Sequence, residues 1–435
     1  MHYQEAMEYL QNLTKFGMNF GLGRITELLR RIGNPHRQIK TIHIGGTNGK
    51  GSTTAMVAGV LHSAGYRVGT FTSPHLHSYT ERYRINGREI EPDRVAGLIA
   101  RLRPHLEAMV QEGFEHPTEF EVSTAMAFCY FLEEKVDYLV LEVGLGGSID
   151  STNVVDPIIS VITNVAMDHM DYLGNTLVEI ARVKAGIIKP GVPVVTAAAK
   201  PEVLEIIKET CREKGCPLVQ LGRDVRWACG EHSLRGQFFD YCGLDRNLSQ
   251  LWIPLIGRHQ VSNAATALAT LEVLSGRGVH LPERALREGL RNTVWPARLE
   301  LIGDSPPVLI DGAHNYDGAR SLRQALDEYF PEYNVIMVLG MLGDKERARV
   351  VAELAPRSRH VVITRPNSPR AGDWQQMAGE ARRYVARVDT VENIEKAVLA
   401  GMQLAREGDL VCVTGSLYMV AEAREVVLRA NNRPV

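Results

Sequence analysis

Apolar residues follow two patterns that alternate along the chain. Short, mostly apolar runs, such as 138–141 and 158–162, are typical of strands buried on both faces of a parallel sheet. The segments 92–112 and 119–134 instead carry apolar residues three and four positions apart, and this spacing predicts helices. Because strands and helices alternate in this way, the sequence predicts an α/β fold with parallel sheets covered by helices.

The alternation is interrupted once and then starts again. Residues 217–256 form short β-like runs with many turns, and the sequence Thr-Val-Trp-Pro-Ala-Arg at 293–298 is typical of a joint between domains. Beyond the joint, strands are predicted at 308–311, 334–339, 360–364 and 409–414 and near 387, and helices at 317–329, 344–355, 373–385, 391–405 and 417–430. We therefore predict two doubly wound domains, residues 1–295 with a small β excursion and a Rossmann-like domain over residues 296–435.

A glycine-rich turn follows the apolar strand at 41–44 and precedes an apolar-periodic helix. Its residues are Gly45, Gly46, Thr47, Asn48, Gly49, Lys50, Gly51 and Ser52. Small residues let backbone N–H groups approach a phosphate, the helix dipole favours negative charge, and a lysine adds a mobile cation. The first domain is therefore predicted to be a P-loop ATP-binding domain, with the Ser52 hydroxyl offered to a phosphate-bound magnesium ion. The strict Walker spacing is not met, because Gly51 separates Lys50 from the hydroxyl residue.

Three polar residues stand at the carboxyl ends of predicted strands, the sheet edge where α/β folds bind ligands. Ser73 and Glu142 offer hard oxygen atoms, which suit magnesium. His169 offers a softer nitrogen, and a histidine in this place is also typical of a structural group. Because all three share one sheet edge with the phosphate loop, we interpret them together as a metal site.

Lys184 begins the sequence Lys-Ala-Gly-Ile-Ile-Lys, where its neighbours are small and apolar. Such surroundings lower the pKa of a lysine and favour the neutral amine. A neutral amine can act as a nucleophile, or it can add carbon dioxide and become an anionic carbamate that holds a metal. An ordinary helix lysine is the alternative that this pattern leaves open.

Two further motifs lie at strand ends of the second domain. Asp311-Gly-Ala-His314-Asn follows an apolar strand, and Gly-Ser416-Leu-Tyr418 stands at the last strand-to-helix turn. Loops at the carboxyl ends of strands in such sheets commonly bind ligands. Both motifs are therefore candidates to face a cleft between the two domains.

Charge and composition exclude several classes of function. The formal net charge of the 435 residues is −2 at pH 7, which gives no electrostatic case for binding nucleic acid or an anionic membrane. No apolar run approaches the ~18 residues of a membrane helix, and the first residues lack the pattern of a signal peptide, so we expect a cytoplasmic protein. Irregular spacing favours free thiols, buried or half-buried, over a zinc cluster of Cys211, Cys216, Cys229, Cys242 and His232.

In this order, the motifs resemble those of the Mur ligase superfamily, whose ATP loop is similar to residues 46–52. The other motifs resemble its folate branch, the folylpolyglutamate synthases and dihydrofolate synthases, and they cover almost the whole chain. They are Thr72-Ser73-Pro74-His75-Leu76, Glu81-Arg82 with Ile85-Asn86-Gly87, Thr118-Glu119-Phe120-Glu121, Glu142-Val143-Gly144-Leu145-Gly146-Gly147, Asp168-His169, residues 184–189 and 295–300, Asp311-Gly312-Ala313-His314-Asn315 and Thr414-Gly415-Ser416-Leu417-Tyr418.

The resemblance implies an ATP-dependent amide ligase. In such a reaction ATP phosphorylates a carboxylate of the folate or pteroate substrate, and the amino group of L-glutamate attacks the acyl phosphate. The acceptor is a folate that already carries glutamate, dihydropteroate, or both, and the sequence leaves this choice open. ATP and magnesium at two sites are the implied cofactors, and the implied state is a monomer with small-molecule partners only.

The resemblance also implies a role for each matching residue. Lys50 and the loop residues Thr47, Asn48, Gly49, Gly51 and Ser52 hold the phosphates, and Asn263, Arg298 and Asp311 complete the nucleotide site. Magnesium is surrounded by Ser73, Glu142 and His169, and Lys184 is carbamylated to support a second metal. Catalysis is assigned to Lys50, His169, Lys184, Asp311 and His314. Substrate contacts are assigned to Arg82, Thr118, Glu119, Phe120, His314, Ser416 and Tyr418.

Two positions depart from the family pattern, Ser148 where an arginine is common and Val183 where a glutamate is common. Any salt bridge that depends on those side chains is therefore in doubt. A cell-wall ligase of the same superfamily is disfavoured, because the folate-branch segments around Glu81 and Thr118 are present and no UDP-binding domain precedes the ATP loop. A nucleotide switch would keep the strict Walker spacing, and a non-catalytic module would have lost some of the phosphate and metal residues.

Overall fold

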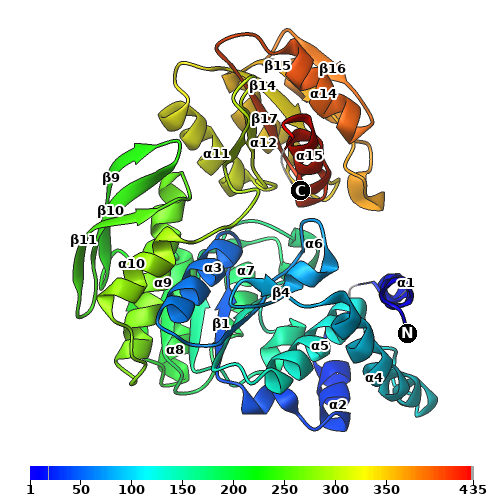
Figure 1. Ribbon diagram of the computed structural model, residues 1–435, viewed down its shortest axis with the longest axis vertical. Helices are drawn as coiled ribbons and strands as arrows, with labels where there is room; N and C mark the ends of the chain where they lie inside the picture. The colour runs from blue at the N-terminus through cyan, green and yellow to red at the C-terminus, as the bar shows by residue number, and fades with distance from the viewer. Residues whose placement is uncertain (18, 433–435) are drawn as a thin grey trace.

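Eight strands form the larger of two main sheets in the computed structural model, which describes residues 1–17 and 19–432 (Figure 1). Their order across the sheet is β4-β3-β2-β5-β1-β6-β7-β8. The strands are β1 Thr41–Gly45, β2 Val68–Phe71, β3 Tyr83–Ile85, β4 Arg88–Glu89, β5 Tyr138–Glu142, β6 Ile159–Ile162, β7 Val194–Thr196 and β8 Leu218–Gln220. All pair in parallel except β3 and β4, which form the predicted hairpin; Asn86 and Gly87 at its turn have φ of 52° and 79°.

The central strands are buried on both faces, and this explains their mostly apolar sequences. In β5, Tyr138 and Val140 pack into an apolar cluster with α3, α9 and α10. Leu139 and Leu141 point to the other face and pack with α1, α2, α4 and α5. The helices of this unit are α1 Tyr3–Leu13, α2 Gly23–Arg31, α3 Lys50–Ser63, α4 Pro92–Gln111, α5 Glu119–Glu133, α6 Met170–Leu173, α7 Leu177–Ala185, α8 Pro201–Glu213, α9 Arg258–Ser275 and α10 Glu283–Arg291.

A separate antiparallel sheet in the order β11-β10-β9 makes up the predicted β excursion. Its strands are β9 Arg226–Ser233, β10 Gly236–Cys242 and β11 Asn247–Ile253. Phe239, Tyr241 and Leu251 anchor it in the same apolar cluster as α9 and α10. The range predicted for the excursion, 217–256, begins too early, because β8 pairs with β7 in the main sheet.

Six strands form the second main sheet, in the order β12-β13-β17-β14-β15-β16. They are β12 Glu300–Ile302, β13 Val308–Ile310, β14 Asn334–Leu339, β15 Ser358–Ile363, β16 Val388–Thr390 and β17 Asp409–Thr414. All pair in parallel except β12, an antiparallel edge strand too short for its period to be recognised in the sequence. The helices are α11 Tyr316–Tyr329, α12 Arg347–Leu354, α13 Gln376–Ala381, α14 Ile394–Leu404 and α15 Leu417–Ala430.

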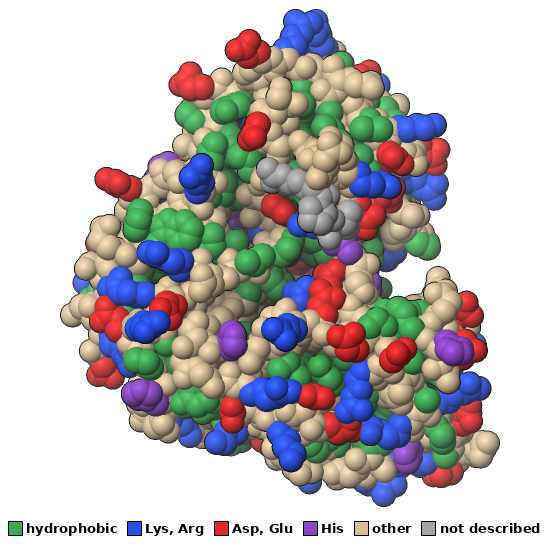
Figure 2. All heavy atoms as spheres, viewed as in Figure 1, with side chains coloured by type: hydrophobic (Ala, Val, Ile, Leu, Met, Phe, Trp, Pro, Cys, Tyr) green, Lys and Arg blue, Asp and Glu red, His purple; other side chains and the backbone are tan. Residues whose placement is uncertain are grey.

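The predicted α/β class with two doubly wound units is confirmed, and helices α12 and α13 are shorter than predicted. Figure 1 shows the second sheet and its helices above the first unit. Figure 2 shows Lys and Arg side chains interspersed with Asp and Glu over the visible face, as the small net charge suggests. Within residues 1–17 and 19–432, no helix combines the length and the apolar content that a membrane span needs.

Candidate active site

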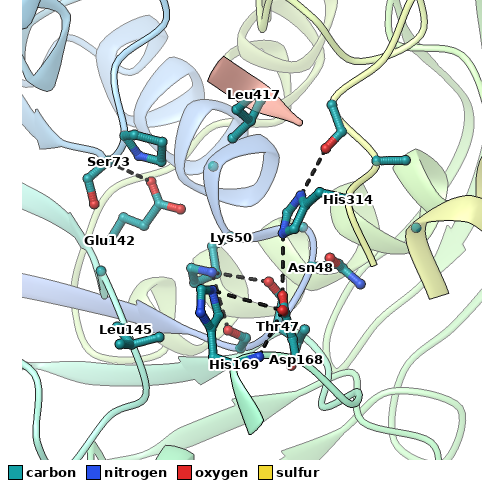
Figure 3. A pocket seen from close by; sticks show the side chains of 18 of the residues that line it. Thr47, Asn48, Lys50, Ser73, Glu142, Leu145, Asp168, His169, His314 and Leu417 are labelled. Carbon is teal, nitrogen blue, oxygen red and sulfur yellow. Dashed lines mark hydrogen bonds and ion pairs between the residues drawn. The ribbon is translucent and has the colours of Figure 1, made fainter. Parts of the chain in front are cut away.

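A cavity of about 500 Å³ lies between the two units, at the carboxyl ends of strands from both sheets. Residues that follow β1, β2, β5 and β6 line one side, and residues that follow β13, β14 and β17 line the other. Figure 3 shows side chains from both sides directed toward one another. The predicted site residues on its wall are Thr47, Asn48, Gly49, Lys50, Gly51, Ser52, Ser73, Arg82, Thr118, Phe120, Glu142, His169, Lys184, Asn263, Arg298, Asp311, His314, Ser416 and Tyr418. Glu119 is the predicted residue that the cavity wall does not include.

Neighbouring segments leave no room for a side chain at several glycines of the phosphate loop, Gly49 and Gly51 among them. Gly49 has φ of 84°, and a Cβ on it would lie 2.4 Å from Asn263 Oδ1. A Cβ on Gly51 would lie 2.4 Å from the indole ring of Trp295, which comes from the joint between the units. The departure from the Walker spacing at Gly51 therefore has a physical cause, since any side chain there would collide with this ring.

Lys50 is the first residue of α3, and its side chain curls back over the loop (Figure 3). Its ammonium group donates to the carbonyls of Gly46 and Thr47 at 3.3 and 3.1 Å. The backbone N–H of Asn48 is held by the side chain of Asn164 at 2.7 Å. The first N–H groups of α3 have no partner within the helix, so a cation and a helix N-terminus face the same part of the cavity.

Glu142 ends β5 with its side chain buried against the cavity. Its Oε2 accepts a hydrogen bond from the backbone N–H of Ser73 at 3.2 Å (Figure 3). Burial raises the pKa of Glu142, and the positive charge of Lys50 opposes this rise. A buried carboxylate beside a serine is a pair of oxygen donors that a hard cation would satisfy.

His169 stands at the start of α6 with a left-handed backbone, φ 50°. Its Nδ1 is buried and has no hydrogen-bond partner within the described residues. Burial lowers the pKa of His169 to about 4. The ring is therefore neutral at neutral pH and keeps a nitrogen lone pair for a ligand.

Lys184 lies on α7, and its side chain is buried behind the phosphate loop. The ammonium group donates to the carbonyl of Gly46 at 2.9 Å. Burial lowers the pKa of Lys184 to about 7, and the charge of Lys50 acts in the same direction. A large fraction of this amine is therefore unprotonated near neutral pH, as its apolar neighbours predicted.

Asp168, in the first unit, contacts three side chains of the second unit. Its carboxylate is paired with the ammonium of Lys345, accepts from Asn315 Nδ2 at 3.0 Å, and lies 3.3 Å from His314 Nε2. Asn315 also exchanges two amide hydrogen bonds with Asn48, at 3.0 and 3.2 Å. Although burial opposes it, the contact with His314 and the charge of Lys345 hold the pKa of Asp168 well below its usual range. We call this group, Asn48, Asp168, His314, Asn315 and Lys345, the interdomain clasp.

Lys345 was not among the predicted residues. It follows β14 in a loop that Arg347 holds by donating to the carbonyls of Met341 and Leu342 at 2.8 and 3.0 Å. The Lys345 side chain is 5% exposed, so this lysine is fixed in the cavity wall rather than solvated. Its signal in the sequence is a lysine shortly after an apolar strand, the same position that singled out Ser73 and His169.

Arg82 directs its guanidinium into the cavity from the segment before β3. It donates to Glu119 at 3.0 Å, to Ser123 Oγ at 3.3 Å and to His75 Nδ1 at 3.0 Å. Glu119 is therefore placed to orient Arg82 rather than to line the cavity.

The same end of the cavity is closed by Thr118 and Phe120. Thr118 caps α5 by accepting from the N–H of Glu121 at 3.3 Å, and the Phe120 ring packs so closely on Gly144 that a Cβ there would lie 2.5 Å away. Asp150, a buried carboxylate that was not predicted, also lines this end. This region combines an aromatic face with polar groups, as a planar polar substrate requires.

Asp311 and Arg298 lie together at the joint side of the cavity. Asp311 accepts from the backbone N–H groups of Leu299 and Ala313 at 3.0 and 2.8 Å, so it ties the chain just after the joint to the loop after β13. Arg298 donates to the carbonyl of Ala297 at 2.9 Å. Asn263, on the first turns of α9, donates to Gln260 at 3.0 Å and faces the same space.

Helix α15 begins at the cavity with Ser416 as its first flanking residue. The Ser416 hydroxyl is buried and has no hydrogen-bond partner within the described part of the chain. Tyr418, the second residue of α15, is half exposed and lines the opening. A second helix N-terminus with a free hydroxyl therefore faces the phosphate loop across the cavity.

The six cysteines are free thiols, and the expectation that they are buried or half-buried is wrong for Cys229 and Cys242. Cys211 is buried, whereas Cys229 and Cys242 are exposed on the small sheet. At the two departures from the family pattern, the backbone N–H of Ser148 donates to the carbonyl of Val183 at 2.8 Å. Those two positions are therefore neighbours, and no salt bridge joins their side chains.

Comparisons with known proteins extend over both units. The Mur ligase middle domain model matches residues 44–271, and the model described as Mur ligase, glutamate ligase domain matches residues 297–417. A dihydrofolate synthase/folylpolyglutamate synthase of Bacillus subtilis is 37% identical over 426 residues, which are 97% of this chain and 98% of that protein. A folylpolyglutamate synthase of Lacticaseibacillus casei is 36% identical over 431 residues, 98% and 99% of the two chains. The crystal structure of Mycobacterium tuberculosis folylpolyglutamate synthase complexed with ADP and AMPPCP is 33% identical, with a TM-score of 0.90 over 98% of this chain and 99% of that chain.

Proposed function

This chain belongs to the Mur ligase family, among its folylpolyglutamate synthases and dihydrofolate synthases, and we propose that it adds L-glutamate to folates through an acyl phosphate. It is an ATP-dependent ligase that acts on small molecules.

One observation carries the proposal: the N-termini of α3 and α15 line opposite sides of one cavity. A helix N-terminus favours an anion. A ligase that activates one carboxylate with phosphate and then brings in an amino acid needs two anion sites on either side of the reacting atoms. Lys50 and α3 supply the site for the triphosphate, and Ser416 with α15 supplies the site for a carboxylate of L-glutamate.

In the proposed reaction an oxygen of the acceptor carboxylate forms a bond to the γ-phosphorus, and the bond from that phosphorus to ADP breaks. The glutamate nitrogen then bonds to the acyl carbon, loses its proton, and displaces inorganic phosphate. Arg82, Thr118 and Phe120 hold the acceptor, while Asn263, Arg298 and Asp311 hold the nucleotide. The interdomain clasp keeps both sides together and water away from the acyl phosphate.

Magnesium fits the donor set of the cavity. Ser73, Glu142 and His169 would hold one ion, and a carbamate on Lys184 would hold a second. Within the described residues no three His, Cys, Asp or Glu side chains form a metal site by themselves, and magnesium accordingly takes much of its shell from phosphates and waters. When bound, the ions would neutralise the charge between the triphosphate and the carboxylate.

We propose that both dihydropteroate and reduced folates are acceptors. The Bacillus subtilis relative is named for both activities and the Lacticaseibacillus casei relative for one. One alternative is therefore an enzyme with a single acceptor. The other alternative is a Mur-type ligase that acts on a different carboxylate acceptor.

We further propose that residues 1–295 and 296–435 are the two domains of a cytoplasmic monomer. One chain supplies both sides of the cavity and both halves of the clasp, so no second copy is needed to complete the site.

The test is phosphate release from ATP by purified protein with magnesium and L-glutamate, with dihydropteroate and tetrahydrofolate supplied separately. Release with both acceptors is expected, and release with only one would assign the activity to that one. Release with neither, in protein that binds ATP, would contradict the proposal. Omitting L-glutamate is the control, because an amide ligase turns over only when the amine is present.

A further inference from the structure

A charged cluster outside the cavity joins three segments that each carry a residue of the proposed site. It consists of His77, Glu300, Arg424 and Glu425, none of which is on the cavity wall. We propose that this cluster positions α15, which carries Ser416 at the proposed L-glutamate site, relative to the loop that carries the proposed metal residue Ser73. His77 is its positioning residue. The inference rests on the proposed function, because it names what the cluster aligns.

The first segment is the loop that runs from Ser73 to His77 in the first unit. The carboxylate of Glu81 accepts from the backbone N–H groups of Leu76, His77 and Ser78 at 3.0, 2.6 and 2.8 Å. These three hydrogen bonds fix the backbone of residues 76–78, at the end of the loop opposite to Ser73. Leu76 packs into the apolar cluster of the second unit that contains Ala297, Val420 and Ala423. The loop that carries the proposed metal residue is therefore docked on the other unit.

His77 forms the polar part of this docking. Its Nε2 lies 3.1 Å from Arg424 Nη1, and its Nδ1 lies 3.0 Å from Glu425 Oε1. A guanidinium group can only donate, so Nε2 accepts from Arg424 and Nδ1 carries the proton that is donated to Glu425. His77 is thus a neutral bridge between a cation and an anion on α15, with its side chain only 18% exposed.

The other two segments meet at Arg424. Arg424 pairs with both carboxylate oxygens of Glu300 at 2.8 and 2.9 Å. Glu300 also accepts from the N–H of Ala297 at 2.8 Å, directly before Arg298 in the nucleotide side of the site. Arg424 itself lies on α15, whose first residues carry Ser416 to the cavity. A shift of α15 relative to His77 would therefore move Ser416 relative to Ser73.

This arrangement predicts a selective defect. The phosphate loop and Asn263, which supply most of the proposed nucleotide contacts, lie in the first unit, so nucleotide binding should depend little on where α15 sits. Binding of L-glutamate requires Ser416 to face the acyl group, so it does depend on α15. Loss of the His77 bridge is therefore expected to affect the KM for L-glutamate far more than the affinity for ADP.

The experiment compares His77→Ala with His77→Gln in the full-length chain. A glutamine offers one acceptor and one donor and can replace both contacts, so H77Q is expected to stay close to the wild type. H77A is expected to raise the KM for L-glutamate about tenfold, the effect of losing a charge-assisted hydrogen bond, with ADP affinity by calorimetry within about twofold. Arg429→Ala is the control on the same helix, because Arg429 lies 3.9 Å from Glu395 with both side chains exposed and should change neither constant.

A double variant, H77A with Arg424→Ala, separates positioning from general destabilisation. If both residues act through one link, the double variant is about as impaired as the worse single variant. Additive losses, an equal loss of ADP affinity, or an H77Q as defective as H77A would overturn the inference. Glu425→Gln keeps the acceptor and removes the charge at an exposed position, so a folded variant with a smaller rise in KM is expected even if H77A is unstable; an unchanged KM would also overturn it.

Wild-type protein in the same assay distinguishes failure of the proposed ligase function from failure of the positioning role of His77. Wild-type protein without glutamate-dependent phosphate release would contradict the proposed function itself. Active wild type with an unchanged KM in H77A would contradict the positioning role alone.

Discussion

The two sides of the cavity are built differently. On the side of the first unit the phosphate site is a continuous stretch, 45–52, whose glycines and helix amides do most of the binding. On the side of the second unit the groups come from separate segments, with His314 and Asn315 after β13, Lys345 after β14 and Ser416 after β17. A site made of backbone has a sequence signature, whereas a site made of scattered side chains exists only once the chain has folded.

Because the two sides of the cavity are built differently, we expect them to have different functions. The first side carries the phosphate loop and Asn263, so it should supply most of the nucleotide binding, with Arg298 and Asp311 adding to it from the second unit. The second side reaches the first through the clasp at Asp168, so it should act mainly on turnover. The variants below test this division, beginning with the largest expected effect.

Lys50→Ala removes the mobile cation of the first side. Its present partners are the carbonyls of Gly46 and Thr47, so the fold should be kept. We expect glutamate-dependent phosphate release to fall by about 10²–10³-fold, together with weaker nucleotide binding measured by calorimetry. A variant with near-normal turnover would show that this loop is not the phosphate site.

Lys345→Ala removes the cation that the second side contributes. Asp168 keeps His314 and Asn315, so we expect kcat to fall by about 10²-fold while ADP affinity stays close to that of the wild type. Lys200→Ala is the matched control, because Lys200 also faces the other unit, 3.7 Å from Asp317, but is 42% exposed and should matter little. Equal losses of kcat and ADP affinity in Lys345→Ala would contradict the assignment of nucleotide binding to the first side and turnover to the second.

Lys184 provides a pH-dependent test of the first side. The pKa of Lys184 is lowered to about 7 by burial, and only the neutral amine adds carbon dioxide. With carbon-13 bicarbonate and magnesium, the carbamate signal should therefore rise about tenfold from about pH 6 to about pH 8. Lys184→Arg should abolish the signal and Lys189→Arg should keep it. A signal that does not change over this range, or that survives in Lys184→Arg, would argue against a carbamate at this residue.

Gly51→Ala tests the contact between the phosphate loop and the joint. The new Cβ would meet the Trp295 ring at 2.4 Å, so we expect ADP affinity to fall about fivefold through overpacking. Adding Trp295→Phe removes the outer ring and should restore most of the loss. Gly97→Ala is the control, because a Cβ there meets nothing within 4 Å. Failure of the second substitution to restore binding would mean that Trp295 is not the cause.

The parts of the site that could be predicted from the sequence share one property. Ser73, Glu142 and His169 stand at or after the ends of strands in the first sheet, and Asp311 follows a strand in the second. Parallel topology brings such positions to the carboxyl edge of each sheet. The hairpin at Asn86 was predictable because its turn chemistry is local.

Other features depend on the neighbours of a residue in space. Lys345 has the same strand-end position as the predicted residues, but a lysine in a polar loop gives no sign that Arg347 and Asp168 will bury it. Glu119 was predicted to contact substrate from its place in a motif, and only the fold shows that it pairs with Arg82. The antiparallel edge strand β12 is three residues long, which is too short to display a period.

The ring of Trp295 against Gly51 gives the molecule an optical consequence. This indole comes from the joint and lies against the phosphate loop at Gly51, so its emission should respond both to nucleotide binding at the loop and to movement of the joint. The chain has only four tryptophans, and the other three are at 227, 252 and 374, away from this contact. The tryptophan fluorescence of the unlabelled protein can therefore report nucleotide binding at the phosphate loop and movement of the joint in real time.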